Sequence, residues 1–229
     1  MGMPFKLSLG QFYGIDSIVE FFIIIVSLII SYYSHKIYKV IKENNYQFFS
    51  WAFLSIAVAF LFKIISNLTI LHTIKIEKAN FIITFLYEYE WIDILNFISF
   101  IMYKVLFIAG FLFLFLIITK TKKKEGILLF VYFSLITILF SVYFNFIFHL
   151  TLVIIMSYLV MHFYMNYKTL KTRNSFFVFF AFLVILISEF SFVFIGLHPL
   201  FYLLGEVLLL VAFITLLLNQ IKLQSQKRK

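Results

Sequence analysis

Two glutamates, Glu189 and Glu206, lie in two long apolar segments that are joined by the short turn 196–199. Ionisable residues are rare in such segments because a carboxylate in hydrocarbon costs several kcal/mol, and those that occur usually serve a function. Each glutamate is seven residues from the turn, so at about 1.5 Å per residue both lie roughly 10 Å below the same membrane face. Two acids at one depth on adjacent helices must be protonated, share a proton or face cations.

Two lysines inside other apolar segments can supply those cations. Lys63 is near the outer end of its segment, and Asn67 shares its helical face at i+4. Lys104 is about ten residues into the next segment, and Glu20 is near the start of the first. We predict a buried ionic cluster that opens outward and binds a ligand, an ion or a proton, with the candidate residues Glu20, Lys63, Asn67, Lys104, Glu189 and Glu206.

A purely architectural role for these charges is the alternative. Lys63 and Glu20 are long enough to extend to the outer interface. Glu189 and Glu206 could instead clamp helices together through Lys104, although buried ion pairs add little net stability. In either role, we expect Lys104 to reach at least one of the two carboxylates inside the bundle.

The composition places the chain in a membrane. Of its 229 residues 64% are apolar and 13% charged, and several apolar runs approach 20 residues. All spans must be helical, because an open strand in lipid leaves backbone groups unpaired. We predict one all-α transmembrane domain, 1–229, with an uncleaved first span as anchor and seven spans at about 17–37, 47–68, 94–119, 126–146, 148–166, 175–196 and 199–219.

The loop charges orient the bundle. Successive loops lie on opposite sides of the membrane, so the segments 36–42, 120–124, 168–173 and 222–229 share one side. These segments hold 14 of the 19 Lys and Arg, and three others lie on the opposite side. This bias predicts an outside N-terminus and a cytoplasmic C-terminus in the cell membrane. Only the outer connection 69–93 is long, and its aromatic and acidic stretch 87–91 suits an interfacial anchor or a lid.

An internal repeat relates the two halves of the chain. Residues 38–54 align with 167–183 at a constant offset of 129, with eight of 17 positions identical. More weakly, 104–111 aligns with 206–213, which makes Lys104 and Glu206 equivalent. Spans one to three would then correspond to spans five to seven, with the fourth as a linker, in parallel repeats related by an axis along the membrane normal.

The sequence lacks the residue patterns that several kinds of metal binding and catalysis require. The chain has no cysteine, which excludes disulfides and thiolate metal sites. Its five histidines include no i,i+4 pair for zinc, and the two on the fifth span face different sides, which disfavours haem. No serine–histidine–acid set or glycine-rich phosphate loop is evident. We therefore predict no catalytic residues, metal or cofactor, and a protein that is not an enzyme.

A loose motif carries a resemblance to other proteins. The stretch 34–54, with Phe60-Leu61-Phe62-Lys63, resembles small archaeal seven-helix membrane proteins of unknown function. The 3+1+3 layout also looks like the broad class of transporters, opsins and receptor-like proteins. The details of that class do not carry over: the last span has no lysine for a retinal Schiff base, and no proline lies in the interior of a span. The resemblance therefore implies a fold class and no function.

The leading functional hypothesis is a sensor or receptor-like protein. It would bind a small polar or zwitterionic ligand, or a proton, in the outer half of the bilayer, and would signal to a cytoplasmic or membrane protein partner through its basic loops. A small solute or proton-coupled transporter is the alternative, and an intramembrane lipid-modifying enzyme is a remote third. The composition does not favour a nucleic-acid partner, since the basic residues lie in short loops.

Overall fold

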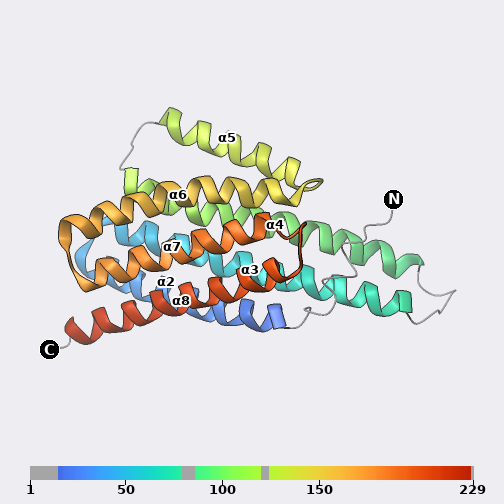
Figure 1. The fold of residues 1–229 in the computed structure, drawn as a ribbon, viewed down its shortest axis with the longest axis horizontal. Helices are drawn as coiled ribbons and strands as arrows, with labels where there is room; N and C mark the ends of the chain where they lie inside the picture. The colour runs from blue at the N-terminus through green and yellow to red at the C-terminus, as the bar shows by residue number, and fades with distance from the viewer. Residues whose placement is uncertain (1–14, 79–85, 120–123, 228–229) are drawn as a thin grey trace.

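The described residues form seven helices. A computed structural model describes residues 15–78, 86–119 and 124–227, and Figure 1 shows their arrangement. The prediction of an all-α bundle of seven helices is confirmed. The helices are α2 (Ile15–Ile41), α3 (Asn44–Lys78), α4 (Leu86–Thr119), α5 (Lys124–Ser141), α6 (Asn145–Leu170), α7 (Arg173–Val193) and α8 (Leu200–Lys227).

Six of these helices are long and apolar enough to cross a membrane, so the chain is a multi-pass membrane protein. The exception within the described ranges is α5, whose apolar segment Val131–Ser141 is shorter. A turn at 142–144 ends α5, and α6 begins directly after it at Asn145. The predicted end of the fourth span at 146 is therefore wrong, because the helix ends at Ser141. That this helix crosses the bilayer stays a prediction.

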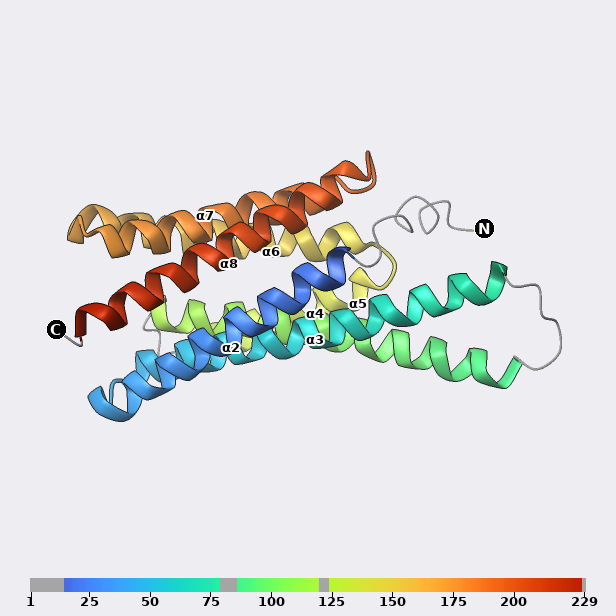
Figure 2. The ribbon, with the colours of Figure 1, turned by 90° about the horizontal axis from the view of Figure 1, so that it is seen from below.

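The predicted long connection 69–93 is mostly helical, which corrects the predicted end of the second span at 68 and the predicted start of the third at 94. In the structure α3 runs on to Lys78 and α4 begins at Leu86. Figure 2 shows these two helices projecting beyond the rest of the bundle. The sequence analysis ended the spans where the apolar runs end, but a helix can continue into polar sequence once it has been nucleated. The N-terminal segment 1–14 lies outside the described residues, and so do 79–85 and 120–123.

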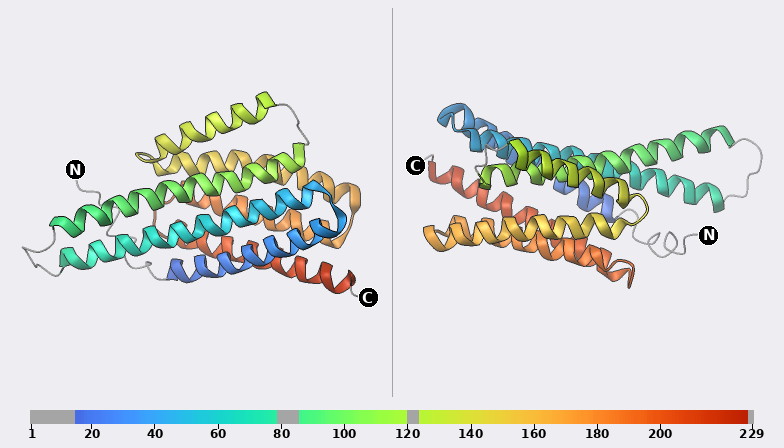
Figure 3. Two further views of the ribbon diagram at one scale, coloured as in Figure 1. Left: turned by 180° about the vertical axis from the view of Figure 1, so that it is seen from behind. Right: turned by 90° about the horizontal axis from the view of Figure 1, so that it is seen from above.

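Six helices form a closed ring around a central axis. The neighbours in contact are α2 with α3, α3 with α4, α4 with α6, α6 with α7, α7 with α8, and α8 with α2. Helix α5 lies outside the ring and contacts α4 and α6 (Figures 1 and 3). The two triplets α2–α4 and α6–α8 follow one another in the same order around the ring. A pair of repeats related by a two-fold axis requires this order, and the repeat itself stays a prediction.

The turns α2–α3 and α6–α7 have the same backbone conformation. Lys42 has a φ of 60° and Lys171 a φ of 49°, both in the left-handed region. The amide of each lysine donates to the carbonyl of the tyrosine four residues earlier, Tyr38 or Tyr167, at 2.8 Å. The offset of 129 aligns Lys42 with Lys171, so the aligned segments share this helix ending as well as their residue types.

Both turns lie at one end of the bundle, together with the C-terminal end of α8 (Figure 1). We name this the basic end, because the described Lys and Arg of the predicted cytoplasmic segments gather there. The start of α2 and the turn between α7 and α8 lie at the opposite end (Figures 1 and 2). We name this the pocket end.

Small side chains hold neighbouring helices close together. The hydroxyl of Ser188 on α7 donates to the carbonyl of Gly205 on α8 at 2.8 Å. A Cβ on Gly205 would lie 2.5 Å from the ring of Phe192, so any larger residue at this position would have to displace that ring. The contact between α7 and α8 therefore fixes the position of Phe192, a residue that lines the site described below.

Candidate functional site

One lysine joins two glutamates from different helices near the pocket end. The ammonium of Lys63 on α3 lies 2.9 Å from Oε1 of Glu20 on α2 and 2.6 Å from Oε1 of Glu206 on α8. Glu20 and Glu206 are almost completely buried, whereas Lys63 is 15% exposed. Because α2 separates α3 from α8 in the ring, Lys63 links two helices that are not neighbours. The structure thus brings together three of the predicted site residues.

A hydrogen-bond network continues from this triad toward the start of α2. The amide of Asn67 donates to both carboxylate oxygens of Glu20, at 3.0 and 3.1 Å. The hydroxyl of Tyr202 donates to Oδ2 of Asp16 at 2.9 Å. Asp16 is buried and also lies 3.5 Å from the amide of Asn67. Asn67, a predicted site residue, therefore lies in the site and holds Glu20 in place through hydrogen bonds.

Glu189, the other glutamate of the hairpin, has a partner that the sequence analysis missed. Its Oε2 lies 2.9 Å from Nδ1 of His149 on α6. His149 also packs against the ring of Phe192, with 5.1 Å between ring centroids. The two glutamates at equal depth thus belong to different clusters: Glu206 contacts Lys63, and Glu189 contacts His149.

The expectation for Lys104 is wrong. Its ammonium donates to the backbone carbonyl of Ser141, the last residue of α5, at 3.1 Å, and lies 3.7 Å from the ring centroid of Phe100. Within the described residues it forms no ion pair with Glu189 or Glu206. Lys104 lies at a suitable depth but on the side of α4 that faces α5 and α6. Its charge instead stabilises the C-terminal end of a helix, where carbonyl groups lack partners.

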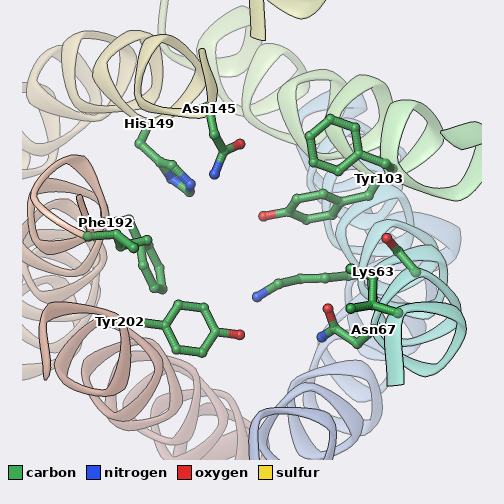
Figure 4. Close-up of a pocket in the computed structure, with 11 residues that line it drawn as sticks. Lys63, Asn67, Tyr103, Asn145, His149, Phe192 and Tyr202 are labelled. Atoms are coloured by element: carbon green, nitrogen blue, oxygen red, sulfur yellow. The ribbon is translucent and has the colours of Figure 1, made fainter. Parts of the chain in front are cut away.

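A cavity of about 160 Å³ lies between the two clusters. The lining residues come from α3, α4, α6 and α8 and from α7 with the turn that follows it. Figure 4 shows the labelled side chains pointing toward one another across the cavity. Four of the lining residues are phenylalanines or tyrosines, and polar or ionisable side chains lie between them. We call this cavity the pocket. Its lining consists of Lys63, Ser66, Asn67, Ile70, Phe100, Tyr103, Asn145, His149, Phe192, Ile195 and Tyr202.

The hydroxyl of Tyr103 points into the pocket (Figure 4). Tyr103 is 9% exposed, and its hydroxyl forms no hydrogen bond with the part of the chain that the structure describes. Oε2 of Glu206 is a buried polar atom that also lacks a hydrogen-bond partner among the described residues, although Glu206 reaches the pocket only through its contact with Lys63. Buried polar groups are normally hydrogen-bonded, so a hydroxyl that faces the pocket without a protein partner indicates a place for a ligand or for water.

Aromatic residues close the bundle on the side of the pocket toward the basic end. Phe60 lies one helical turn from Lys63, and its ring packs edge-on against Phe107 at 5.5 Å and Phe213 at 6.3 Å. These three rings come from α3, α4 and α8 and are at most 1% exposed. The pocket therefore ends at an apolar layer and does not continue through the bundle.

The acidic side chains around the pocket have basic partners. Among the described residues, no group of three or more His, Asp or Glu side chains is arranged to hold a metal ion. The acids pair instead with an ammonium and an imidazole, which suits charge recognition or proton binding.

The pocket also contains residues that the sequence analysis did not select. Phe192 and Tyr202 gave no signal because aromatic residues are abundant throughout the chain. Asn145 and His149 did offer one. They are a polar pair at i and i+4 at the start of an apolar segment, and the offset of 129 places them on Asp16 and Glu20.

No family model, curated protein or solved structure matches the chain. The geometry of the pocket is therefore the basis on which a function can be assigned.

Proposed function

We propose that the chain is a receptor-like protein of the cell membrane that binds a small polar ligand or a proton in the pocket. The observation that carries this proposal is the position of Lys63. Its side chain lines the pocket and at the same time pairs with Glu20 of the first triplet and Glu206 of the second. Any group that enters the pocket must compete with these contacts or add to them.

A change at Lys63 can be transmitted to the far end of the bundle. Weakening the contact with Glu206 would release α8 from α3, and both helices run from the pocket to the basic end. A ligand shifts such an equilibrium only by its difference in affinity for the two arrangements. In the proposed orientation the basic end is cytoplasmic, and its lysines and arginines are available to a membrane or cytoplasmic partner protein.

Cysteine labelling tests both the pocket and the orientation. Because the natural chain lacks cysteine, each introduced thiol is unique. Ser66→Cys reports on the pocket, and Lys168→Cys on α6 reports on the basic end. A small membrane-impermeant thiol reagent added to intact cells should label the first variant, and should label the second only after the membrane is opened. Failure to label Ser66→Cys from either side would mean that the pocket is closed to ligands. External labelling of Lys168→Cys would reverse the orientation.

A carrier is the second candidate, and one observation favours it. Under the two alignments of the repeat, Lys63 corresponds to Phe192 and Phe100 to Tyr202, and all four residues line the pocket. A pocket lined by equivalent residues lies near the axis between two repeats, where carriers place their substrate.

The same cysteine distinguishes the two functions. In a carrier, Ser66→Cys should become accessible from the cytoplasmic side in inside-out vesicles as well as from outside in intact cells. In a receptor it should remain accessible from one side only. The aromatic layer of Phe60, Phe107 and Phe213 favours access from one side, because these buried rings separate the pocket from the basic end.

A further inference from the structure

The pocket lies in a region with too little positive charge. Three glutamates, Glu20, Glu206 and Glu189, are paired with one lysine and one histidine. If the carboxylates are ionised, the group lacks at least one positive charge even when His149 is protonated. Charges are screened weakly inside an apolar bundle, so this deficit favours any cation that can reach the pocket.

Aromatic rings surround the ammonium of Lys63, the lysine of the pocket lining. Nζ of Lys63 lies 5.5 Å from the ring centroid of Phe60 and 5.8 Å from those of Tyr103 and Phe192. These distances are within the range of cation–π attraction. Tyr103 and Phe192 also line the pocket, as does Tyr202. A second cation in the pocket would therefore find aromatic rings like those that surround the ammonium of Lys63.

The size of the pocket and its polar groups limit the ligand further. A buried cavity of about 150 Å³ accommodates a molecule of the size of benzene, and the pocket measures about 160 Å³. The hydroxyl of Tyr103, which has no partner in the described structure, can accept or donate one hydrogen bond. A bare metal ion would leave most of this volume empty, whereas a compact organic cation would fill it.

We propose that the pocket binds a small organic ammonium ion, held by the aromatic rings of its lining and attracted by the excess carboxylate charge of Glu20, Glu206 and Glu189. These three glutamates do not line the pocket themselves but contact Lys63 and His149, which do. Lys63 then serves as the resident cation, which the ligand supplements or displaces from Glu206. This proposal rests on the proposed function and names the class of ligand for the same pocket. An anionic ligand is disfavoured because no unpaired cation in the pocket lining is available to it.

Binding of choline to the purified full-length protein tests the proposal. Choline combines a quaternary ammonium with a hydroxyl, and its neutral analogue has a tert-butyl group in place of the trimethylammonium. Titration calorimetry and thermal unfolding, both at one pH and ionic strength, should show saturable binding of choline, with the neutral analogue at least about tenfold weaker. Propionate serves as the anionic probe and should not bind.

Variants locate the binding site. Phe192→Leu removes an aromatic wall and should weaken choline binding roughly tenfold, and Glu206→Gln should weaken it to a similar degree. Tyr103→Phe should weaken binding of choline but not of tetramethylammonium, which has no hydroxyl. Glu43→Gln is the matched control, because Glu43 is exposed in the turn between α2 and α3 and should leave binding unchanged.

Each contrary result has a definite meaning. Equal binding of choline and the neutral analogue, or stronger binding of propionate, would overturn the ammonium proposal. The proposal would also be overturned if no ammonium binds and the unfolding temperature depends on pH in the natural chain but not in Glu206→Gln. The group bound at the pocket would then be a proton. If Ser66→Cys is labelled but no ammonium binds, the choice of ligand fails and the proposed function stands. If Ser66→Cys is not labelled from either side, both fail.

Discussion

The first triplet, α2–α4, and the second, α6–α8, place different chemistry at positions that the offset of 129 aligns. The offset of 129 aligns Glu20 with His149 and Lys63 with Phe192, and in each triplet the first helix supplies a titratable group near the pocket end. In the first triplet that group pairs with a lysine of the next helix, and in the second it pairs with Glu189. A similar framework can thus support an ionic wall on one side of a pocket and an aromatic wall on the other.

The wall formed by the first triplet should contribute more to stability. Lys63→Met leaves two buried carboxylates without their cation, and removal of one partner of a buried ion pair typically costs about 3–5 kcal/mol. Chemical unfolding in detergent measures the loss. Adding Glu206→Gln should recover part of it. A loss no larger than that caused by an exposed substitution, such as Lys168→Met, would show that Lys63 does not hold the helices together.

The corresponding pair of the second triplet should matter less. Glu189→Leu removes the acceptor of His149 and strands one buried donor, so we expect a loss of about 2 kcal/mol in the free energy of unfolding. The imidazole resonance of His149 should shift in the NMR spectrum of the variant. An unchanged resonance would indicate that the two side chains do not meet.

Lys104 provides a comparison between two buried lysines. Lys104→Met removes one hydrogen bond to a backbone carbonyl and the contact of the ammonium with the ring of Phe100, but strands no opposite charge. It should therefore cost about 1–2 kcal/mol, less than Lys63→Met. Its effect should add to that of Glu206→Gln within about 0.5 kcal/mol, because the two residues do not touch. A larger coupling would restore the contact that the sequence analysis expected.

The smallest effect is expected at the two turns α2–α3 and α6–α7, which have the same backbone conformation. The side chain of Thr172 accepts a hydrogen bond from the amide of Ser175 and caps α7. Thr172→Ala should therefore cost about 1 kcal/mol in thermal unfolding. Glu43 occupies the aligned position before α3, and Glu43→Ala should change stability by less than about 0.5 kcal/mol. Equal losses would mean that both residues act as caps.

The sequence was sufficient to predict the helices and the depth of the charged layer. The number of helices and their all-α arrangement follow from long apolar runs, which only helices can carry through lipid. Glu20, Lys63 and Glu206 could be assigned to one layer because depth follows from distance along a helix. The apolar runs did not show where α3 and α4 end, since both helices continue into polar sequence.

Partners within that layer could not be predicted, because they depend on how each helix is rotated about its own axis. Lys104 has the right depth, yet it faces α5 and binds the carbonyl of Ser141. His149 contacts Glu189, 40 residues away on another helix, and no spacing rule within one helix indicates such a pair. The alignment of the repeat held more information than was used, since it places His149 on Glu20.

A mutant cycle of Lys63→Met and Glu206→Gln tests most directly whether Lys63 joins the two triplets across the pocket. The free energy of unfolding is measured for the natural chain, both single variants and the double variant under one detergent condition. The contact of 2.6 Å predicts that the double variant loses less stability than the two single losses together, by more than about 1 kcal/mol. Additivity within about 0.5 kcal/mol would show that the two charges do not meet, and would contradict the proposed pocket.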